Sequence, residues 1–185
     1  MAAIDSVSDG FALFDADDRL VFSNRRFKEL NPDLAPKIVP GISFEEMLRE
    51  NIAANRILSA IGDEEAFIRA RMEQHRNPSG PLVQQRRDGR WLELREERTP
   101  EGATFLVNTD ITERKRAEES SRQLIAAFNA LNETVTVYDA DDRLVFCNER
   151  DRTENSAVAE STIPGITFED RIKVMLAQGL IPEAQ

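Results

Sequence analysis

The sequence predicts an α+β fold, and three observations lead to that prediction. Two short apolar runs flank an acidic turn near the start of the chain, which is typical of a β-hairpin. Segments with the apolar spacing of short helices follow, and three further runs separated by turn residues then predict three more strands. The hairpin pattern returns near the end of the chain, so the sequence predicts one full unit and part of a second.

The clearest feature of the chain is an internal repeat. The eight residues Asp15–Phe22 read Asp-Ala-Asp-Asp-Arg-Leu-Val-Phe, and the same eight occur again at Asp139–Phe146, 124 residues later. The segment Pro40–Glu45 returns at the same offset as Pro164–Glu169, with one conservative change. Eight consecutive identities lie far beyond chance at average residue usage. The two copies are therefore expected to share one backbone shape.

The hairpin in each copy has two different faces. Ala12 of the first copy is Thr136 in the second. Phe14 is likewise Tyr138, whereas the alternate positions beside them stay apolar. Because successive strand residues face opposite sides of a sheet, one face of the hairpin admits hydroxyl groups. That face is expected to line a pocket or to meet solvent.

Short helices are expected between the hairpin and the later strands. Asn24 can cap a short helix that ends before the next Asn-Pro pair. Ser43 and Glu46 form a capping box at the start of a second helix, and Asp63 can cap a third over residues 64–75. The apolar side of the second helix is predicted to contain Phe44, Met47, Leu48, Ile52, Ile57 and Leu58.

Three strands are expected at residues 82–87, 91–98 and 103–109. The Asp88-Gly89 pair between the first two is one of the strongest hairpin turn signals, and a Pro-Glu-Gly segment separates the last two. In the middle strand the side chains fall into two alternating sets. One set is Leu92, Leu94 and Glu96, and the other is Trp91, Glu93 and Arg95. This alternation is typical of an antiparallel strand with solvent on one side.

A charged and strongly helical segment is predicted over residues 113–133. Asp110 and Glu113 fit a capping pattern at its start. Alternating steps of four and three residues then relate the small or apolar side chains of Ala117, Ser121, Leu124, Phe128 and Leu131. This spacing is a short heptad seam, which is buried against a second helix. We therefore expect a homodimer formed through this helix.

Size and composition limit the class of protein. A chain of 185 residues with 41% hydrophobic residues has room for about one and a half ordinary domains. The net charge of −10 argues against nucleic acid or an anionic membrane as a partner, because both bind clustered Lys and Arg. The apolar runs are too short to span a bilayer, and no secretory leader is seen. The single cysteine, Cys147, excludes an internal disulfide, so we expect a soluble cytoplasmic protein.

Four motifs resemble those of a PAS domain, the sensor module common in bacterial signalling proteins. They read Asp-Gly-Phe-Ala-Leu-Phe-Asp at 9–15, Asn-Arg-Arg-Phe at 24–27, Asp-Gly-Arg-Trp at 88–91 and Asp-Ile-Thr-Glu-Arg-Lys at 110–115. The last motif is the most diagnostic. The resemblance covers residues 1–116 in full and residues 125–185 as an amino-terminal half.

The resemblance implies a five-stranded antiparallel sheet with helices on one face, often enclosing a small-molecule pocket. It implies a PAS domain at 1–112, a connecting amphipathic helix at 113–133 and a partial second PAS domain at 134–185. That partial domain has two strands and an open sheet edge. We therefore expect it to be stabilised by a partner chain, docked on the first domain or poorly ordered.

In the PAS family a closing Asp-Ile-Thr couples the last strand to an outgoing signalling helix. By resemblance, Asp110 and Thr112 take that coupling role here, together with Trp91 at the turn motif. A cap at a strand-to-helix junction sets the starting angle of the helix. A small shift of the last strand is therefore expected to move the far end of the helix.

Candidates for cofactor binding are few. Some PAS domains bind haem through a histidine before the third strand, which makes His75, the only histidine, a weak candidate ligand. Near the end of its helix, His75 is instead expected to be an exposed polar residue, and haem is not predicted. Arg25 stands where light-sensing relatives have a reactive cysteine, which excludes flavin photochemistry in the first copy. Cys147 is expected to be a small half-buried residue at a strand end.

No enzyme activity and no metal site is predicted. Four pairs of adjacent acids are expected on turns and solvated positions, at Asp17-Asp18, Glu45-Glu46, Glu64-Glu65 and Glu96-Glu97. They have no nucleophile or base partner in the sequence. A kinase would also need a phosphoacceptor histidine on a dimer helix and a glycine-rich nucleotide-binding domain, and neither is found in this sequence.

The leading hypothesis is a PAS sensor and dimerisation region of a larger bacterial signalling protein, of the histidine kinase or diguanylate cyclase type. The output domain of that parent protein is then a further partner. Two alternatives stay open. One is a receptor domain for a small molecule or cofactor, and the other is a pure protein-interaction scaffold.

Overall fold

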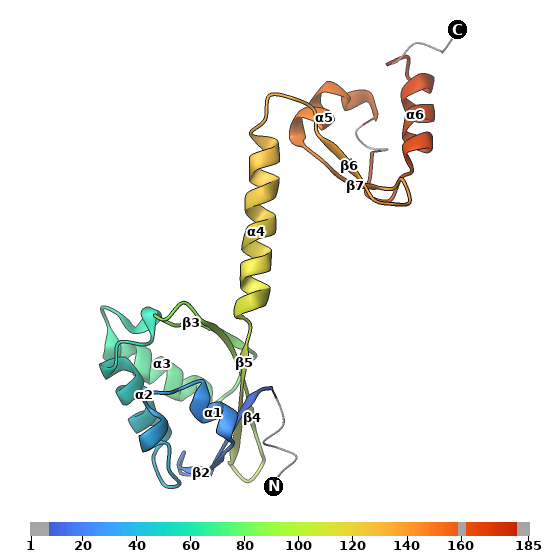
Figure 1. Cartoon of the computed structure of the whole chain (residues 1–185). Helices are drawn as coiled ribbons and strands as arrows, with labels where there is room; N and C mark the ends of the chain where they lie inside the picture. The colour runs from blue at the N-terminus through green and yellow to red at the C-terminus, as the bar shows by residue number, and fades with distance from the viewer. Residues whose placement is uncertain (1–7, 159–161, 181–185) are drawn as a thin grey trace. The chain divides into compact units, whose positions relative to one another are not determined.

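The computed structural model describes residues 8–158 and 162–180 (Figure 1). The chain divides into two compact units, residues 1–116 and 117–185, here called unit 1 and unit 2. Each unit has its own arrangement of strands and helices, and each is described by itself.

Unit 1 is built on a five-stranded antiparallel sheet, as the resemblance implied. The strands are β1 (Gly10–Phe14), β2 (Leu20–Ser23), β3 (Leu82–Gln85), β4 (Trp91–Arg98) and β5 (Thr104–Asp110). Their order in the sheet is β2-β1-β5-β4-β3, so the first and last strands of the unit lie next to each other. β5 therefore pairs with β1 on one side and with β4 on the other.

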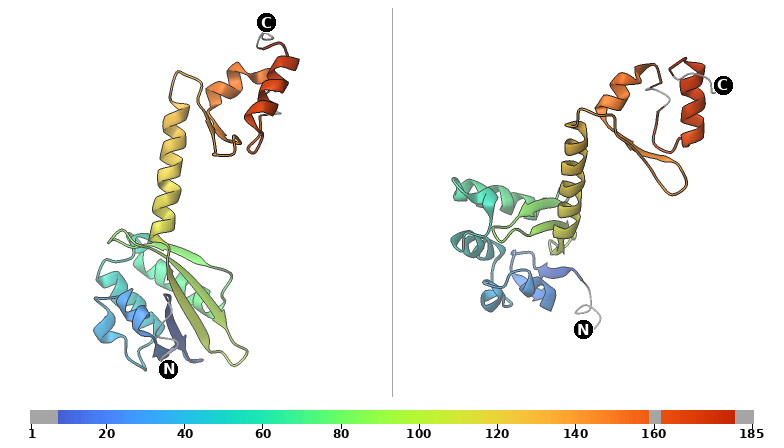
Figure 2. Two further views of the ribbon diagram at one scale, coloured as in Figure 1. Left: turned by 45° about the vertical axis from the view of Figure 1, so that its right-hand side comes forward. Right: turned by 45° about the horizontal axis from the view of Figure 1, so that its top comes forward.

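The helices of unit 1 lie between β2 and β3 in the chain and cover one face of the sheet (Figures 1 and 2). They are α1 (Arg25–Glu29), α2 (Phe44–Ala53) and α3 (Glu64–Arg76), with short 3-10 turns η1 (Ala35–Lys37) and η2 (Leu58–Ala60). The predicted caps are present, since Asn24, Ser43 and Asp63 each accept a backbone N–H of the following helix. The main core side chains between these helices and the sheet are Phe14, Leu20, Phe27, Phe44, Leu92 and Leu106.

Two element boundaries in unit 1 differ from the sequence-based expectation. α2 ends at Ala53, before Ile57 and Leu58, because Asn55 adopts a left-handed conformation with φ of 56° that stops the helix. Ile57 instead pairs with Arg86 as an isolated bridge. β3 ends at Gln85 because Arg86 opens the tight turn, where its carbonyl accepts the N–H of Gly89.

Unit 2 contains most of α4 (Thr112–Asn129), which begins in unit 1. It continues with β6 (Thr136–Tyr138), β7 (Leu144–Cys147), α5 (Glu149–Glu154), the 3-10 turn η3 (Ser156–Val158) and α6 (Phe168–Ala177). α4 is shorter than the predicted helix at 113–133. Its end is fixed by unit 2 itself, because Asn148 Nδ2 donates to the Phe128 carbonyl at 3.0 Å, and Asn129 Oδ1 accepts the Glu149 N–H at 3.0 Å.

The hairpin geometry of unit 1 recurs in unit 2 at the offset of the sequence repeat. Leu13 pairs with Phe22 and Val137 with Phe146, and both hairpins have an irregularity just after that pair. The turn residues Asp18 and Asp142 are both left-handed, with φ of 57° and 55°. In each unit the carbonyl of this aspartate accepts the first N–H of the next long helix at 2.8 Å.

One asparagine ties the hairpin to the following helix in each unit. Asn24 Oδ1 accepts the N–H groups of Phe11 (2.8 Å) and Phe27 (2.9 Å), and Asn24 Nδ2 donates to the Asp9 carbonyl (3.0 Å). Asn148 makes the corresponding set of three bonds in unit 2. Both asparagines are buried, so no water replaces these bonds if the side chain is removed.

The interiors of the two units differ in chemistry. In unit 2, Arg171 lies 2.5 Å from Asp151 as a buried ion pair, and its guanidinium also donates to Tyr138 Oη (3.2 Å) and Thr136 Oγ1 (3.4 Å). The hydroxyl-bearing face of the second hairpin therefore meets an arginine. The residues 124 positions earlier are the buried apolar side chains Met47, Phe27, Phe14 and Ala12.

Asn24→Ala is expected to lower the free energy of unfolding of unit 1 by about 2 kcal/mol, because it leaves two backbone N–H groups and one carbonyl without partners. Urea unfolding followed by the fluorescence of Trp91, the only tryptophan, measures this change. Asn77→Ala, at an exposed asparagine bonded to Glu73, is the control and should change the value by less than about 0.5 kcal/mol. Equal effects of the two variants would contradict the structural role of Asn24.

Candidate functional site

The end of β5 and the start of α4 are hydrogen-bonded to the start of β4. The N–H of Ile111 donates to the Trp91 carbonyl at 2.9 Å, and the Trp91 N–H donates to Thr112 Oγ1 at 3.0 Å. Thr112 in turn donates its N–H (3.0 Å) and its hydroxyl (2.5 Å) to Asp110 Oδ1. The structure therefore brings together the three residues that the sequence singled out for coupling. We call this group of Trp91, Asp110, Ile111 and Thr112 the junction.

The first turn of α4 makes two more contacts with β4. Arg114 Nη2 lies 3.1 Å from Glu93 Oε1, and Lys115 Nζ lies 5.8 Å from the centre of the Trp91 ring. Hydrogen bonds from Arg114 and Arg95 hold the pKa of Glu93 below its usual value. The first turn of α4 is thus held by both the backbone and the side chains of one strand.

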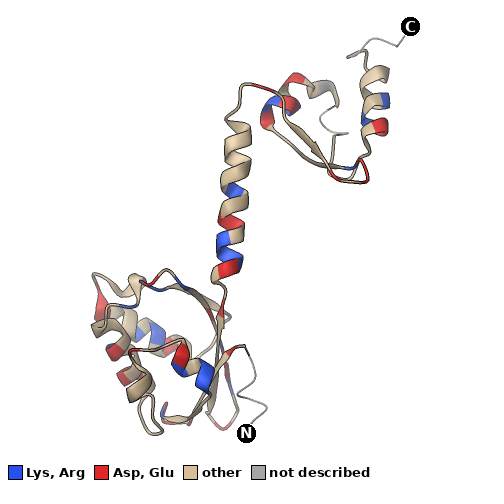
Figure 3. Cartoon of the chain, viewed as in Figure 1, with Lys and Arg blue, Asp and Glu red and all other residues tan. Residues whose placement is uncertain are grey.

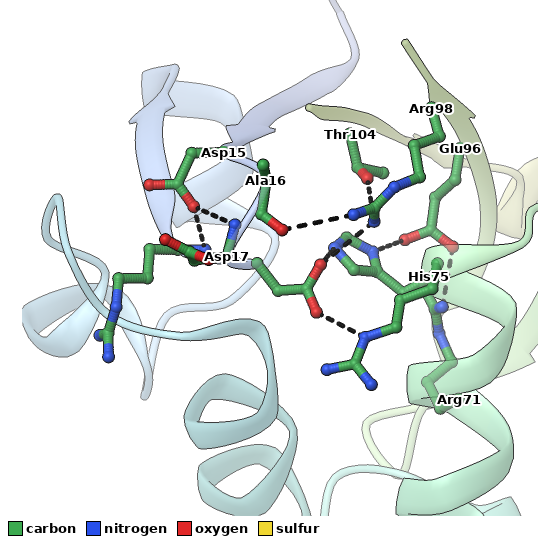
Figure 4. A network of polar contacts seen from close by, with 11 residues as sticks. Asp15, Ala16, Asp17, Arg71, His75, Glu96, Arg98 and Thr104 are labelled. Carbon is green, nitrogen blue, oxygen red and sulfur yellow. Dashed lines mark hydrogen bonds and ion pairs between the residues drawn. The ribbon is translucent and has the colours of Figure 1, made fainter. Parts of the chain in front are cut away.

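A second cluster of polar side chains is buried between α3 and the sheet (Figure 4). His75 Nδ1 lies 2.5 Å from Glu96 Oε1, and Arg71 Nη1 lies 2.7 Å from Glu96 Oε2. The imidazole of His75 stacks on the Phe44 ring with a centroid distance of 3.8 Å. The expectation that His75 is exposed is wrong, because its side chain has no exposed surface.

Asp18 extends this cluster to the turn between β1 and β2, through its contacts with Arg76 and Arg98. Its carboxylate accepts from Arg76 Nε (2.8 Å) and Arg98 Nη1 (3.2 Å) and lies 3.9 Å from His75 Nε2. We call the set Asp18, Arg71, His75, Arg76, Glu96 and Arg98 the buried network, of which the exposed Arg76 and the partly exposed Arg98 form the outer edge. It connects the first hairpin, α3 and β4 within unit 1.

The placement of two acids corrects the sequence-based interpretation. Asp18 and Glu96 were expected on solvated positions with their neighbours, but both side chains are buried and paired. The burial of Glu96 could have been predicted from the alternation of residues along the strand. Glu96 follows Leu92 and Leu94 on the inward-facing register of β4, where an acid needs a buried cation.

Both carboxyl groups stay ionised inside the protein. Burial alone raises the pKa of Glu96, but hydrogen bonds from His75 and Arg71 outweigh it and bring the net pKa below the ordinary value. Burial also opposes the ionised form of Asp18, and hydrogen bonds from Arg76 and Arg98 again lower its pKa overall. Glu96 with Arg71, and Asp18 with Arg76 and Arg98, are therefore ion pairs at neutral pH.

The packing around His75 also limits its access to a haem. The His75 ring is enclosed, with Phe44 stacked on one face and Phe14 edge-on at a centroid distance of 5.1 Å. A haem could reach the ring nitrogens only if these core side chains moved. Among the residues that the structure describes, no cluster of three or more His, Cys, Asp or Glu side chains is arranged to hold a metal ion.

The expected dimer seam is only partly helical. Ala117 and Leu124 are exposed on α4, and Leu124 has 56% of its surface accessible. Phe128 is half-buried, and its ring lies 5.7 Å from that of Phe146 in unit 2. Leu131 lies beyond the end of the helix at Asn129, so it does not continue the helical seam.

Sequence comparison places unit 1 in a known family. The family described as PAS fold matches residues 4–119, which is more than half of the chain. The chain belongs to the PAS family. PAS domains are generally sensory and interaction modules without catalytic activity of their own. Over residues 8–158 and 162–180, the helices lack the combination of length and apolar character needed to cross a bilayer.

Individual relatives were also found. The chain is 33% identical over 125 residues to the "Non-motile and phage-resistance protein" of Caulobacter vibrioides, a match that covers 65% of this chain and 13% of that protein. A solved structure described as an RNA-binding Light-Oxygen-Voltage receptor is similar at 22% identity and a TM-score of 0.41, covering 68% of this chain and 36% of the other. The phage VqmA-DPO complex is similar at 18% identity and a TM-score of 0.40, covering 66% and 56%.

Glu96→Gln is expected to lower the free energy of unfolding of the PAS domain by about 3 kcal/mol, because Arg71 and His75 lose their buried carboxylate partner. The measurement is urea unfolding followed by Trp91 fluorescence. Glu97→Gln, the exposed neighbour on the same strand, is the control and should stay within about 0.5 kcal/mol of the unchanged protein. A small effect of both variants would show that the pairs around Glu96 do not stabilise the fold.

The PAS domain is also expected to lose stability in acid. Asp18 and Glu96 have lowered pKa values when folded, so their stabilisation is fully present above the ordinary values of 3.8 and 4.5 and is lost as the pH falls through the folded values. Unfolding measured from about pH 6 to pH 3 should show this decline. Glu96→Gln should have a shallower decline over the same range, and an identical slope would contradict this assignment.

Proposed function

We propose that this chain is the sensing and relay region of a bacterial signal-transduction protein, of the histidine kinase or diguanylate cyclase type. The single observation that carries the proposal is the junction, where the Thr112 hydroxyl joins the start of β4 to the start of α4. Because the chain spans only 13% of its Caulobacter relative, the output domain is a separate part of such a parent protein.

The relay works through the two central strands of unit 1. β4 carries Glu96 of the buried network at one end and Trp91 of the junction at the other, and β5 runs directly into Asp110. A change in the position of either strand changes the hydrogen bonds that set the direction of α4. Strands and helices are stiff over this length, so a small shift at the sheet becomes a larger movement along the helix.

Unit 2 is proposed to be the amino-terminal half of a second PAS domain. Three features support this proposal: the hairpin register that unit 2 shares with unit 1, the left-handed conformation of Asp142, and Asn148, which joins the hairpin to the next helix. In this proposal α4 leaves one sensor module and enters the next. The signal from unit 1 then arrives at the start of the second domain.

The relay is proposed to act in a homodimer through α4. Charged side chains gather in the first half of the helix, whereas residues 123–129 have none (Figure 3). Leu124 and Ile125 are exposed in that uncharged half. A second copy of the helix would cover them along the seam of Ala117, Ser121 and Leu124.

A receptor for a small molecule is the second candidate function. It is favoured by a polar-walled cavity inside unit 1, whose residues include Arg71 of the buried network. The third possibility, a protein-interaction scaffold, requires the dimer but no change at the junction.

Thr112→Val is expected to increase amide hydrogen exchange at Trp91 and in the first turn of α4 by about five- to tenfold, the effect of losing one hydrogen bond. The valine side chain keeps the shape of threonine but neither accepts the Trp91 N–H nor donates to Asp110, and only the backbone N–H of residue 112 can still donate to Asp110. Thr112→Ser keeps both bonds and is the matched control. Exchange in α2 should not change in either variant. If Thr112→Val leaves Trp91 as protected as before, the hydroxyl does not couple the strand to the helix.

Leu124→Asp is expected to raise the dimer dissociation constant at least about 100-fold, because each dimer loses two buried leucines and gains two charges. Sedimentation of the whole chain over a range of concentrations measures this. Ala126→Asp adds the same charge to an exposed position on the other side of α4 and should leave the dimer intact. If the unchanged protein is a monomer, or if both variants weaken the dimer equally, the proposed seam is contradicted.

A further inference from the structure

Unit 1 has a partly open cavity of about 30 Å³ that is lined by residues of α2, α3 and the sheet. Its polar lining consists of Asn31, Asn51, Arg71, Gln84, Arg86 and Asn108, all of them buried. Buried polar groups in a folded domain are normally paired with one another or with an occupant. This lining is therefore unusual for the interior of a small domain and calls for a physical explanation.

Arg86 is the least compensated of these groups. Only 4% of its surface is exposed, and it forms no ion pair with any residue in the described ranges 8–158 and 162–180. Its two hydrogen-bond acceptors are neutral amides, Asn51 Oδ1 at 3.2 Å and Asn31 Oδ1 at 3.4 Å, and its Nε has no partner. Burial, together with the nearby charges of Arg56 and Arg90, lowers the pKa of Arg86 to about 10.

The charges around the cavity do not balance. Arg71 is paired with Glu96, whereas Arg86 has no carboxylate, so the lining carries one uncompensated positive charge. Three further buried atoms of the lining have no hydrogen bond: Arg71 Nη1, which has only its ion-pair contact with Glu96, the Nη2 donor of Arg71 and the Oδ1 acceptor of Asn108. An oxyanion can satisfy the Arg71 donor, whereas Asn108 Oδ1 needs a hydroxyl such as that of bicarbonate. An occupant with one negative charge and several oxygen atoms would satisfy the donors.

We propose that this cavity binds a small planar oxyanion of three or four non-hydrogen atoms, of the size of formate, nitrate or bicarbonate. A guanidinium group presents coplanar N–H donors that match a planar oxyanion. A cavity of about 30 Å³ matches a ligand of a few non-hydrogen atoms. The inference deepens the proposed sensing function by naming the class of ligand.

Arg86 also provides a way in. It lines a surface hollow of about 320 Å³ whose walls carry three arginines, Arg56, Arg86 and Arg87, and two aspartates, Asp33 and Asp88. The positive charges of this hollow exceed its negative ones, whereas the chain as a whole has a net charge of −10, so the hollow is a comparatively favourable entry for a small anion. An anion that enters the hollow meets Arg86 before it reaches the cavity.

The cavity touches both strands of the relay. Asn108 lies on β5 two residues before Asp110, and Leu94 lies on β4 three residues after Trp91. An anion that draws Arg86 or Asn108 towards it therefore acts on the strands that end at the junction.

The test is a titration of the whole chain, with formate, nitrate and bicarbonate in separate arms and sodium chloride balancing the ionic strength. The side-chain amide resonances of Asn51, Gln84 and Asn108 are followed by nuclear magnetic resonance. Saturable shifts are expected with a dissociation constant of about 1 mM, which is weaker than the limits of roughly 0.5 mM for a three-atom ligand and roughly 0.04 mM for a four-atom ligand. Succinate, which is too large, should give no saturable shift.

The matched variants are Arg86→Met and Arg69→Met, which remove the same charge from a buried position in the cavity and from an exposed position on α3 that lines neither the cavity nor the hollow. Arg86→Met should weaken the binding at least about tenfold, and Arg69→Met should leave it within about twofold. Without anion, Arg86→Met should melt at the same temperature as the unchanged protein or higher, because an unpaired buried charge is gone.

Absence of saturable shifts for all three anions in the unchanged protein overturns the proposal, and this holds even if Arg86→Met fails to fold. Equal weakening in both arginine variants also overturns it. The relay has a separate readout, the fluorescence of Trp91. If an anion binds but the Trp91 fluorescence does not change, the anion site is supported and its link to the junction is contradicted. If no anion binds, the relay proposed from the Thr112 variants is not affected.

Discussion

The structure of unit 1 depends on a carboxylate placed inside the protein. Glu96 lies on the inward face of β4 and would be unstable there without Arg71 and His75, which α3 supplies at 2.7 Å and 2.5 Å. These pairs fix α3 against the sheet in one position, because an apolar contact could slide and a buried ion pair cannot. The aromatic rings of Phe44 and Phe14 then pack around His75.

The same strand explains how the interior is connected to α4. β4 is paired along its length with β5, and the two strands reach the junction together. At the junction both backbone groups of Trp91 are used, one by Ile111 and one by Thr112. The helix therefore has no independent freedom at its start. A sensing mechanism that alters the interior of unit 1 needs no lid or hinge loop, since the two central strands already lead to the helix.

Much of this arrangement could be predicted from the sequence, and the exceptions have physical causes. Alternation and the Asp-Gly turn predicted β4 with its observed bounds, and polar caps predicted the starts of the helices. The sequence analysis missed the burial of His75 because it treated the end of a helix as exposed. In the structure, Glu96 on the facing strand β4 pairs with the His75 ring in the interior. Arg86 was missed because its role depends on Asn31 and Asn51, which are distant in sequence and carry no pattern of their own. The seam was predicted to include Leu131 because spacing alone does not show that Asn148 stops the helix.

The repeat shows that one backbone frame can hold two different interiors. The turn aspartate and the capping asparagine are identical in both copies, and they make the same backbone hydrogen bonds. Several inward-facing positions differ between the copies, since Met47 corresponds to Arg171 and Phe27 to Asp151, whereas Leu20 and Leu144 are the same and both buried. The bonds that define the hairpin are made by backbone groups and two polar side chains, so they do not constrain what faces inward. Under the proposal that unit 2 begins a second PAS domain, its buried Arg171–Asp151 pair neutralises itself, whereas Arg86 in unit 1 does not. The two domains would then respond to different chemistry while passing signals through the same kind of frame.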